Sequence, residues 1–172
     1  MGCFTQRRSI GFLRGVLPRT YDKQVCSIAR TLEAVGDRWT MLVIRDAFLG
    51  VRRFEDFQRD LGVARNVLTD RLARLVDDGI LERRRYQEKP ERFEYRLTEK
   101  GVDLWPVLVS LMKWGDRHAA PDGPPMLITH RDCGGEVDER FRCAKCGADV
   151  DARSAEARPG PAAARRWPSA VL

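Results

Sequence analysis

The sequence lacks most of the features from which enzymes and membrane proteins are built. It contains only two histidines, His118 and His130, and it has no glycine-rich phosphate loop, nucleophile elbow or metalloprotease motif. No run of about 18 apolar residues occurs in it, which excludes a transmembrane helix. We therefore expect neither an enzyme nor a membrane protein.

The cysteines do not form the pattern of a disulfide framework. There are five, an odd number, with Cys3 and Cys26 near the start and the other three close to the end. The first twenty residues carry four arginines and no uninterrupted apolar stretch, so we expect no signal peptide. These features predict a cytoplasmic protein with reduced thiols.

Acidic residues are scarce at both ends of the chain. The formal net charge of +6 favours an anionic partner, with nucleic acid first among them. Residues 1–23 carry a net charge of +4 and residues 152–172 carry +3, whereas residues 24–151 sum to −1. The case for DNA binding therefore depends on where individual Arg and Asn residues lie in the central region.

Composition divides the chain into four zones. Residues 1–23 form a basic leader that we expect to be flexible. Residues 24–120 are dense in periodic apolar positions, and residues 121–151 hold a Pro- and Gly-containing linker followed by the cysteine cluster. Residues 152–172 are mainly Ala, Arg and Pro, and we expect a disordered tail there.

The central zone changes from helical to strand periodicity. Two short helices around a glycine turn, near 54–61 and 65–78, are typical of a helix-turn-helix. An alternating hairpin over 81–86 and 92–97 follows them as a wing. The other helices are expected near 26–35, 38–49 (the buried central helix) and 98–118, where Pro106 should kink the helix or limit its first turn. The fold class is thus mainly α with a small β-hairpin wing, a winged helix-turn-helix, plus a short ribbon-like β appendage.

The helix near 65–78 is the candidate recognition helix. The first turns of such a helix enter the major groove, where Arg and Asn read base edges. Arg65, Asn66 and Thr69 occupy that end, and Arg71 and Arg74 could reach a base or a phosphate. An ordinary solvated polar face is the alternative, favoured by three aspartates on the same helix.

Cations on the wing are the second group of candidate DNA contacts. Arg84, Arg85, Lys89 and Arg92 are expected to contact phosphate or the minor groove. Nearby glutamates allow the alternative of a charge-balanced strand.

A possible metal site follows the linker. His130 and Cys133 form one pair with two residues between them, and Cys143 and Cys146 form another. Three thiolates and an imidazole suit tetrahedral zinc, which would supply folding energy to a segment too short for a large core. The alternatives are a ribbon without metal, a Cys143–Cys146 redox pair, or His118 as the fourth ligand.

Residues from about 20 to 120 carry an ensemble of motifs: Cys26, Gly36-Asp37-Arg38-Trp39, Arg45-Asp46, Phe54-x-x-Phe57, Leu68-Thr69-x-Arg71-Leu72, Asp78-Gly79-Ile80-Leu81 and Tyr95-x-Leu97-Thr98. As an ensemble they resemble the HxlR-type group of bacterial winged-helix regulators. The resemblance implies a homodimeric DNA-binding transcription factor on a pseudo-palindromic operator, whose first and last helices form the dimer interface. We expect this regulator to be a repressor.

Two further assignments follow from this resemblance. Exposed apolar stripes would form the dimer interface, although a stripe buried within one chain has the same pattern; the residues are Ile28, Leu32, Leu104, Leu108, Leu111 and Met112. Cys26 matches a cysteine that senses oxidants in some relatives, and a helix N-terminus favours a thiolate. A small half-buried residue is the alternative for Cys26.

We therefore predict a sequence-specific DNA-binding transcriptional regulator with a zinc-ribbon-like appendage. One alternative is a thiol-based redox regulator that uses Cys26 or the cysteine cluster. Another is a protein-interaction module of the transcription machinery. A small-molecule effector is compatible with an apolar pocket at a dimer interface, but the sequence names no ligand.

Overall fold

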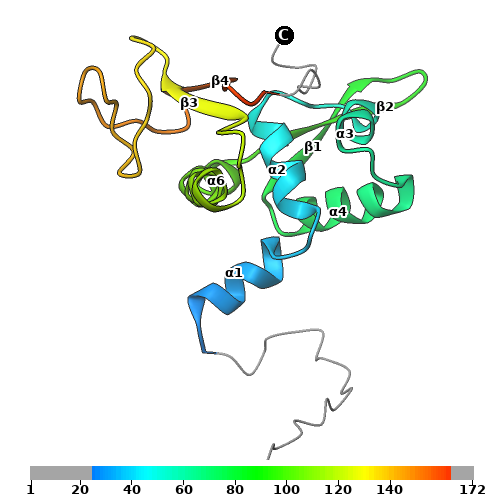
Figure 1. The fold of residues 1–172 in the computed structure, drawn as a ribbon. Coiled ribbons are helices and arrows are strands. Elements are labelled where there is room, and N and C mark those ends of the chain that lie inside the picture. Colours follow the sequence, from blue (N-terminus) through cyan, green and yellow to red (C-terminus); the bar gives the residue numbers. More distant parts are fainter. Residues whose placement is uncertain (1–24, 164–172) are drawn as a thin grey trace, which may run out of the picture.

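The computed structural model describes residues 25–163, which form a helical body with a wing and a small β unit (Figure 1). The basic leader predicted over 1–23 lies outside these residues, as does the end of the predicted tail. No helix in the described part of the chain is long and apolar enough to cross a membrane.

The helical body is built around the central helix that the sequence predicts. Val43, Ile44 and Ala47 of this helix have no exposed surface, which agrees with its nearly all-round apolar sequence. Helices α3 and α4 pack against it, and Gly62 ends α3 in a left-handed conformation with φ of 62°. The four helices are α1 (Ser27–Val35), α2 (Thr40–Phe48), α3 (Phe54–Leu61) and α4 (Arg65–Asp77).

The wing is the antiparallel hairpin of β1 (Leu81–Gln87) and β2 (Arg92–Leu97), paired from Leu81 opposite Leu97 to Gln87 opposite Arg92. A single bridge from Arg53 to Glu94 adds a short third element to its edge. One isolated bridge has no sequence periodicity, so the sequence does not reveal it.

The single helix expected over residues 98–118 is in fact two. Helix α5 (Glu99–Val102) is capped by Thr98, whose side chain accepts a hydrogen bond from the Gly101 amide. Helix α6 (Trp105–His118) then begins with Pro106 in its first turn. Because proline lacks an N–H, it is tolerated where that donor is unpaired and cannot continue a preceding helix.

The C-terminal β unit, here called the ribbon, spans residues 126–159. Strand β3 (Met126–His130) pairs antiparallel with β4 (Ala155–Pro159). The prediction of a disordered tail from residue 152 is therefore wrong for the part that the structure describes. Ala155 is buried while Arg158 is exposed, and this strand alternation is hard to recognise in an Ala- and Arg-rich segment.

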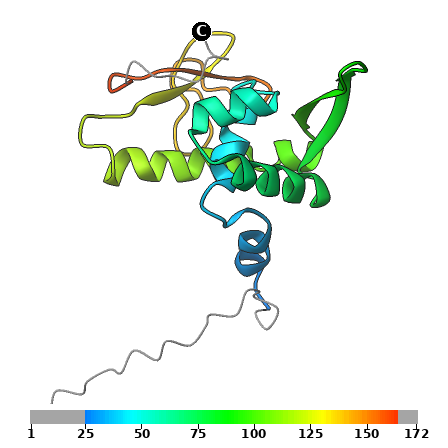
Figure 2. The ribbon, with the colours of Figure 1, turned by 90° about the vertical axis from the view of Figure 1, so that its right-hand side faces the viewer.

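The ribbon lies next to α6 (Figure 2). A second hydrophobic cluster holds the two together. Trp105 and Val109 of α6 contribute to it, as do Ile128, Val137 and Cys143 of the ribbon. Phe48 of α2 also packs against this cluster, so both α2 and α6 contact the ribbon.

Two of the residues predicted for the dimer interface are packed within the chain. Leu104 packs against the core of the helical body, and Met112 packs against the cluster under the ribbon. A buried stripe and an interface stripe have the same spacing, so the sequence could not separate them. Ile28, Leu32 and Leu111 are exposed.

Candidate nucleic-acid interface and metal cluster

Helix α4 presents a polar face along its first two turns. Leu68, Leu72 and Leu75 on the opposite face are each 1% exposed and fix the helix on the body. Arg65, Asn66 and Thr69 are exposed. The structure therefore brings the three predicted base-reading residues together on an accessible surface.

Two of these side chains already have partners. The Arg65 guanidinium lies 4.7 Å from the centre of the Phe54 ring of α3, a cation–π arrangement that restricts the arginine. The Thr69 hydroxyl donates to the Arg65 carbonyl at 2.8 Å, so its oxygen lone pairs are what it can offer to a base.

Arg71 has a structural position rather than the predicted DNA-facing one. Its side chain is only 16% exposed and its Nε lies 2.9 Å from Oδ1 of Asp37, which precedes α2. Arg71 thereby links the recognition helix to the start of the central helix. Arg74 is exposed and forms an ion pair with Asp70 at 3.4 Å.

The four wing cations that the sequence predicts as DNA contacts fall into two groups. Arg84 forms an ion pair with Glu82, and Arg85 pairs with Glu91 at 3.3 Å, which agrees with the charge-balanced alternative. Lys89 and Arg92 are exposed, and neither has an acidic partner in the described part of the chain. Both of these cations at the wing tip are therefore available to a phosphate.

Sequence reasoning missed one residue beside the wing. Arg53 is exposed and its guanidinium lies 4.9 Å from the centre of the Tyr86 ring. Arg53 forms the isolated bridge to Glu94 at the edge of the wing. It therefore adds a cation to the wing although it lies outside the hairpin sequence.

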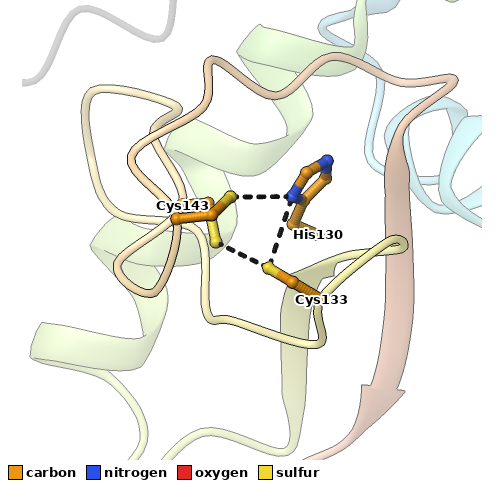
Figure 3. A group of neighbouring side chains, drawn as sticks. His130, Cys133 and Cys143 are labelled. Atoms are coloured by element: carbon orange, nitrogen blue, oxygen red, sulfur yellow. Dashed lines mark hydrogen bonds between the residues drawn. The ribbon is translucent and has the colours of Figure 1, made fainter.

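The predicted metal-ligand side chains converge in the ribbon (Figure 3). One ligand atom from each of His130, Cys133, Cys143 and Cys146 lies within 4.8 Å of all the others. Cys133 Sγ is 3.3 Å from Cys143 Sγ, and His130 Nδ1 is 3.3 Å from Cys146 Sγ. Tetrahedral zinc with Zn–S bonds of about 2.3 Å needs neighbouring sulfurs only slightly further apart. The rival ligand His118 is not in this group.

Glycines shape both turns that carry these ligands. The Gly134 amide donates to the His130 carbonyl at 2.8 Å, and the Gly147 amide donates to the Cys143 carbonyl at 2.9 Å. Both glycines have positive φ, 69° and 74°. At Gly135 a Cβ atom would lie only 2.5 Å from Cys143 Sγ, so only glycine leaves room for the sulfur.

The electrostatics of the cluster favour a thiolate. The backbone N–H of Cys146, together with that of Lys145, donates to Cys143 and lowers its pKa to about 6. The Gly135 amide lowers the pKa of Cys133, but hydrogen bonding to Cys143 and burial outweigh it and raise the pKa. On the histidine, Nε2 lies 3.6 Å from an Asp132 carboxylate oxygen, which suits an imidazole that ligates through Nδ1. Three sulfurs and one nitrogen with these surroundings form a possible metal site.

Cys26 lies at the other end of the molecule. It occupies the N-cap position of α1, is exposed, and its side chain makes no capping hydrogen bond.

Comparisons with known proteins agree with the helix-turn-helix assignment. The HxlR-like helix-turn-helix family matches residues 34–122. Rv3095 of Mycobacterium tuberculosis (strain ATCC 25618 / H37Rv), an uncharacterized HTH-type transcriptional regulator, is 48% identical over 136 residues, which cover 78% of this chain and 86% of that protein. That span is longer than the family match itself, so the similarity extends beyond the helix-turn-helix region.

Solved structures show the same fold. The structure of PA1607 is similar with a TM-score of 0.63 and 39% identity, over 77% of this chain and 94% of that one. The oxidized form of the redox regulator HypR is similar with a TM-score of 0.51 and 32% identity, over 54% of this chain and 97% of that one. The chain belongs to the HxlR-like helix-turn-helix family and is a DNA-binding transcriptional regulator.

Proposed function

We propose that the protein binds a pseudo-palindromic operator as a homodimer, represses transcription there, and carries a structural zinc ion in its ribbon. The observation that carries the DNA-binding part is the exposed first turns of α4, where Arg65, Asn66 and Thr69 lie together. Asn66 suits an adenine edge, and Arg65 suits a guanine edge. Lys89 and Arg92 at the wing tip supply sequence-independent phosphate contacts.

The dimer is supported by apolar side chains that one chain leaves exposed. Helix α1 extends away from the body in both views and has Val35 as its buried residue (Figures 1 and 2). Ile28 on α1 is 71% exposed and Trp114 on α6 is 60% exposed, beside Leu111 at 54%. A nine-residue helix with so little burial is marginal by itself, and a second copy would cover these side chains.

Zinc is supported by the donor set of the ribbon. His130, Cys133, Cys143 and Cys146 would hold it, and its charge would neutralise thiolates that otherwise repel each other. When bound, the ion supplies folding energy to the ribbon and takes no part in a reaction. Metal analysis of purified protein should find one zinc per chain, and Cys146→Ser should reduce that occupancy.

Repression follows from the simplest use of such a dimer, which is to occupy promoter DNA and exclude polymerase. Selection of bound fragments from genomic DNA tests the proposal. We expect enrichment of fragments that share an inverted repeat, and transcription from those promoters in vitro should fall when protein is added. Recovery of unrelated fragments in proportion to their length would contradict it.

Thiol-based regulation through Cys26 is a second candidate, because this thiol is exposed at a helix N-terminus and the fold is similar to HypR. Hydrogen peroxide would oxidise the thiolate to a sulfenic acid and itself be reduced to hydroxide. DNA affinity measured before and after peroxide, in wild type and Cys26→Ser, tests this. Loss of affinity in wild type alone supports it, and an equal response of both proteins contradicts it.

A further inference from the structure

A cavity of about 310 Å³ lies where α2, α6 and the ribbon sheet meet. Figure 1 shows these three elements side by side, with α6 beneath the β3–β4 sheet. Phe48 of α2 and Trp105 and Met112 of α6 line it, as do Met126 and Ile128 of β3. Its size is within the range of sites that hold small organic ligands.

Small side chains on β4 leave this space open. Ala155 and Ala157 line the cavity, and Ala157 pairs with Ile128 across the sheet. Arg158, the next residue, is exposed and forms an ion pair with Glu156. Because the two alanines leave this space open, the hydrophobic cluster of the body and that of the ribbon meet only in part. Phe48 packs against both clusters.

Among the residues that the structure describes, Arg45 is the single charged one in the lining. Its Nε and one terminal nitrogen lie 2.8 Å and 2.7 Å from the same oxygen of Asp46, whose side chain is fully buried. A guanidinium has five N–H donors, so this ion pair leaves others for an acceptor in the cavity. The lining therefore combines a broad apolar surface with one hydrogen-bonding cation.

We propose that this cavity binds a small aromatic carboxylate. The ring system would lie between α2, α6 and β4, and the carboxylate would accept hydrogen bonds from Arg45. The apolar lining suits an apolar body. The N–H groups of Arg45 that Asp46 does not occupy suit an anionic acceptor, since a cation or a purely apolar ligand leaves those N–H groups without a partner in the cavity.

A ligand in this position would contact the helical body and the ribbon at once. Binding would thus stabilise their packing by mass action. Helix α2 also contacts the recognition helix α4, which gives the site a route to DNA affinity. That last consequence rests on the proposed DNA-binding function, whereas the binding of the carboxylate is measurable without DNA.

The test is calorimetric titration of the full, zinc-supplemented chain with 2-naphthoate, and with 2-naphthylmethylammonium as a probe of similar shape and opposite charge. We expect binding of the carboxylate to be at least about tenfold tighter than that of the cation, the scale of one charge-assisted hydrogen bond. Ala157→Leu fills the cavity and should weaken naphthoate binding about tenfold or more. Arg158→Leu, on the same strand but outside the lining, should leave it within about twofold.

Arg45→Gln should also weaken binding of the carboxylate while leaving any binding of the cation unchanged. Arg45→Gln also removes the partner of Asp46 and could therefore fail to fold. In that case the comparison of Ala157→Leu with Arg158→Leu decides whether the cavity binds the carboxylate. Equal affinity for the two probes overturns the proposal, as does an Ala157→Leu variant that binds like wild type. Loss of naphthoate binding as the protein dimerises also overturns it, because a second copy then fills the cavity.

Discussion

The ring of Trp105 on α6 and the ring of Phe141 in the ribbon lie with centroids 5.6 Å apart and planes inclined by 50°. This tilted contact joins the helical body to the ribbon, and Phe141 is only two residues from Cys143. The possible metal site and the last helix of the DNA-binding unit therefore share one hydrophobic cluster.

Truncation of this contact should destabilise the whole chain. Phe141→Ala removes a half-buried ring and should lower the free energy of unfolding by about 1–3 kcal/mol. Denaturant unfolding measures this, with Tyr86→Ala on the exposed wing as the control, expected to cost less than about 1 kcal/mol. Equal effects of the two substitutions would indicate that the ribbon does not support the body.

Metal removal should unfold the ribbon, and substitution of one glycine should reproduce the effect. A Cβ at Gly135 would lie 2.5 Å from Cys143 Sγ, so Gly135→Ala should lower zinc occupancy and the melting temperature, as a chelator does. Gly115→Ala in α6 is the matched control, because a Cβ there meets nothing within 4 Å. That control should be neutral or stabilising by up to about 1 kcal/mol. Full zinc binding by Gly135→Ala would contradict the assignment of the cluster.

Asn66 and Lys89 should affect DNA binding in different ways. Asn66→Ala should cost about 1–3 kcal/mol on the operator and little on random DNA, because it removes a base contact. Lys89→Ala should weaken both DNAs alike and reduce the salt slope by about 1, because it removes a phosphate contact. Anisotropy titrations over a range of salt concentrations distinguish these outcomes. An equal loss on both DNAs for Asn66→Ala would count against base reading.

The Arg71–Asp37 ion pair should act on stability and not on base preference. Asp37 is partly exposed, so its coupling to Arg71 should be about 0.5–1 kcal/mol in a double-mutant cycle of the two alanine variants. Base preference in a panel of operator mutants should be unchanged in Arg71→Ala. A changed preference at one base pair would contradict this and would indicate that Arg71 contacts DNA, as the sequence suggested.

Asp151 makes part of the stability of the ribbon dependent on pH. Its carboxylate accepts hydrogen bonds from the Ser154 hydroxyl and from the backbone N–H groups of Ser154 and Arg153, which lower its pKa. A lowered pKa in the folded state stabilises the protein above the unfolded value of about 3.9, and this contribution is lost as pH falls through the folded value. Thermal melts between pH 7 and pH 3 should show a smaller acid-induced loss for Asp151→Asn than for wild type. Identical slopes for the two proteins would contradict this.

Much of the helical body was predictable because its local signals agree with one another. The apolar run around Val43, the glycine at Gly62 and the alternation up to Leu97 each predict the element that forms. The convergence of His130, Cys133, Cys143 and Cys146 was predictable because each of the two pairs has the short spacing of a chelating pair.

The features that the sequence did not reveal depend on packing. Strand β4 has little hydrophobic signal, because Ala155 and Ala157 face a cavity and need no large side chain. The burial of Arg71 depends on Asp37, which lies 34 positions away in the sequence. The sequence predicts Leu104 in an interface, whereas it packs within the chain, because helical spacing shows that a face is apolar without showing what covers it.

The spacing of half-sites on the selected operator tests the central claim most directly. If two copies present two α4 helices to one face of DNA, a hydroxyl-radical footprint should show two protected half-sites about 10 bp apart, centre to centre, or a multiple of that distance. Leu32→Glu, which places a charge on the exposed face of α1, should abolish the paired footprint. A single protected half-site with wild-type protein, unchanged in Leu32→Glu, would contradict the account of a dimeric DNA reader.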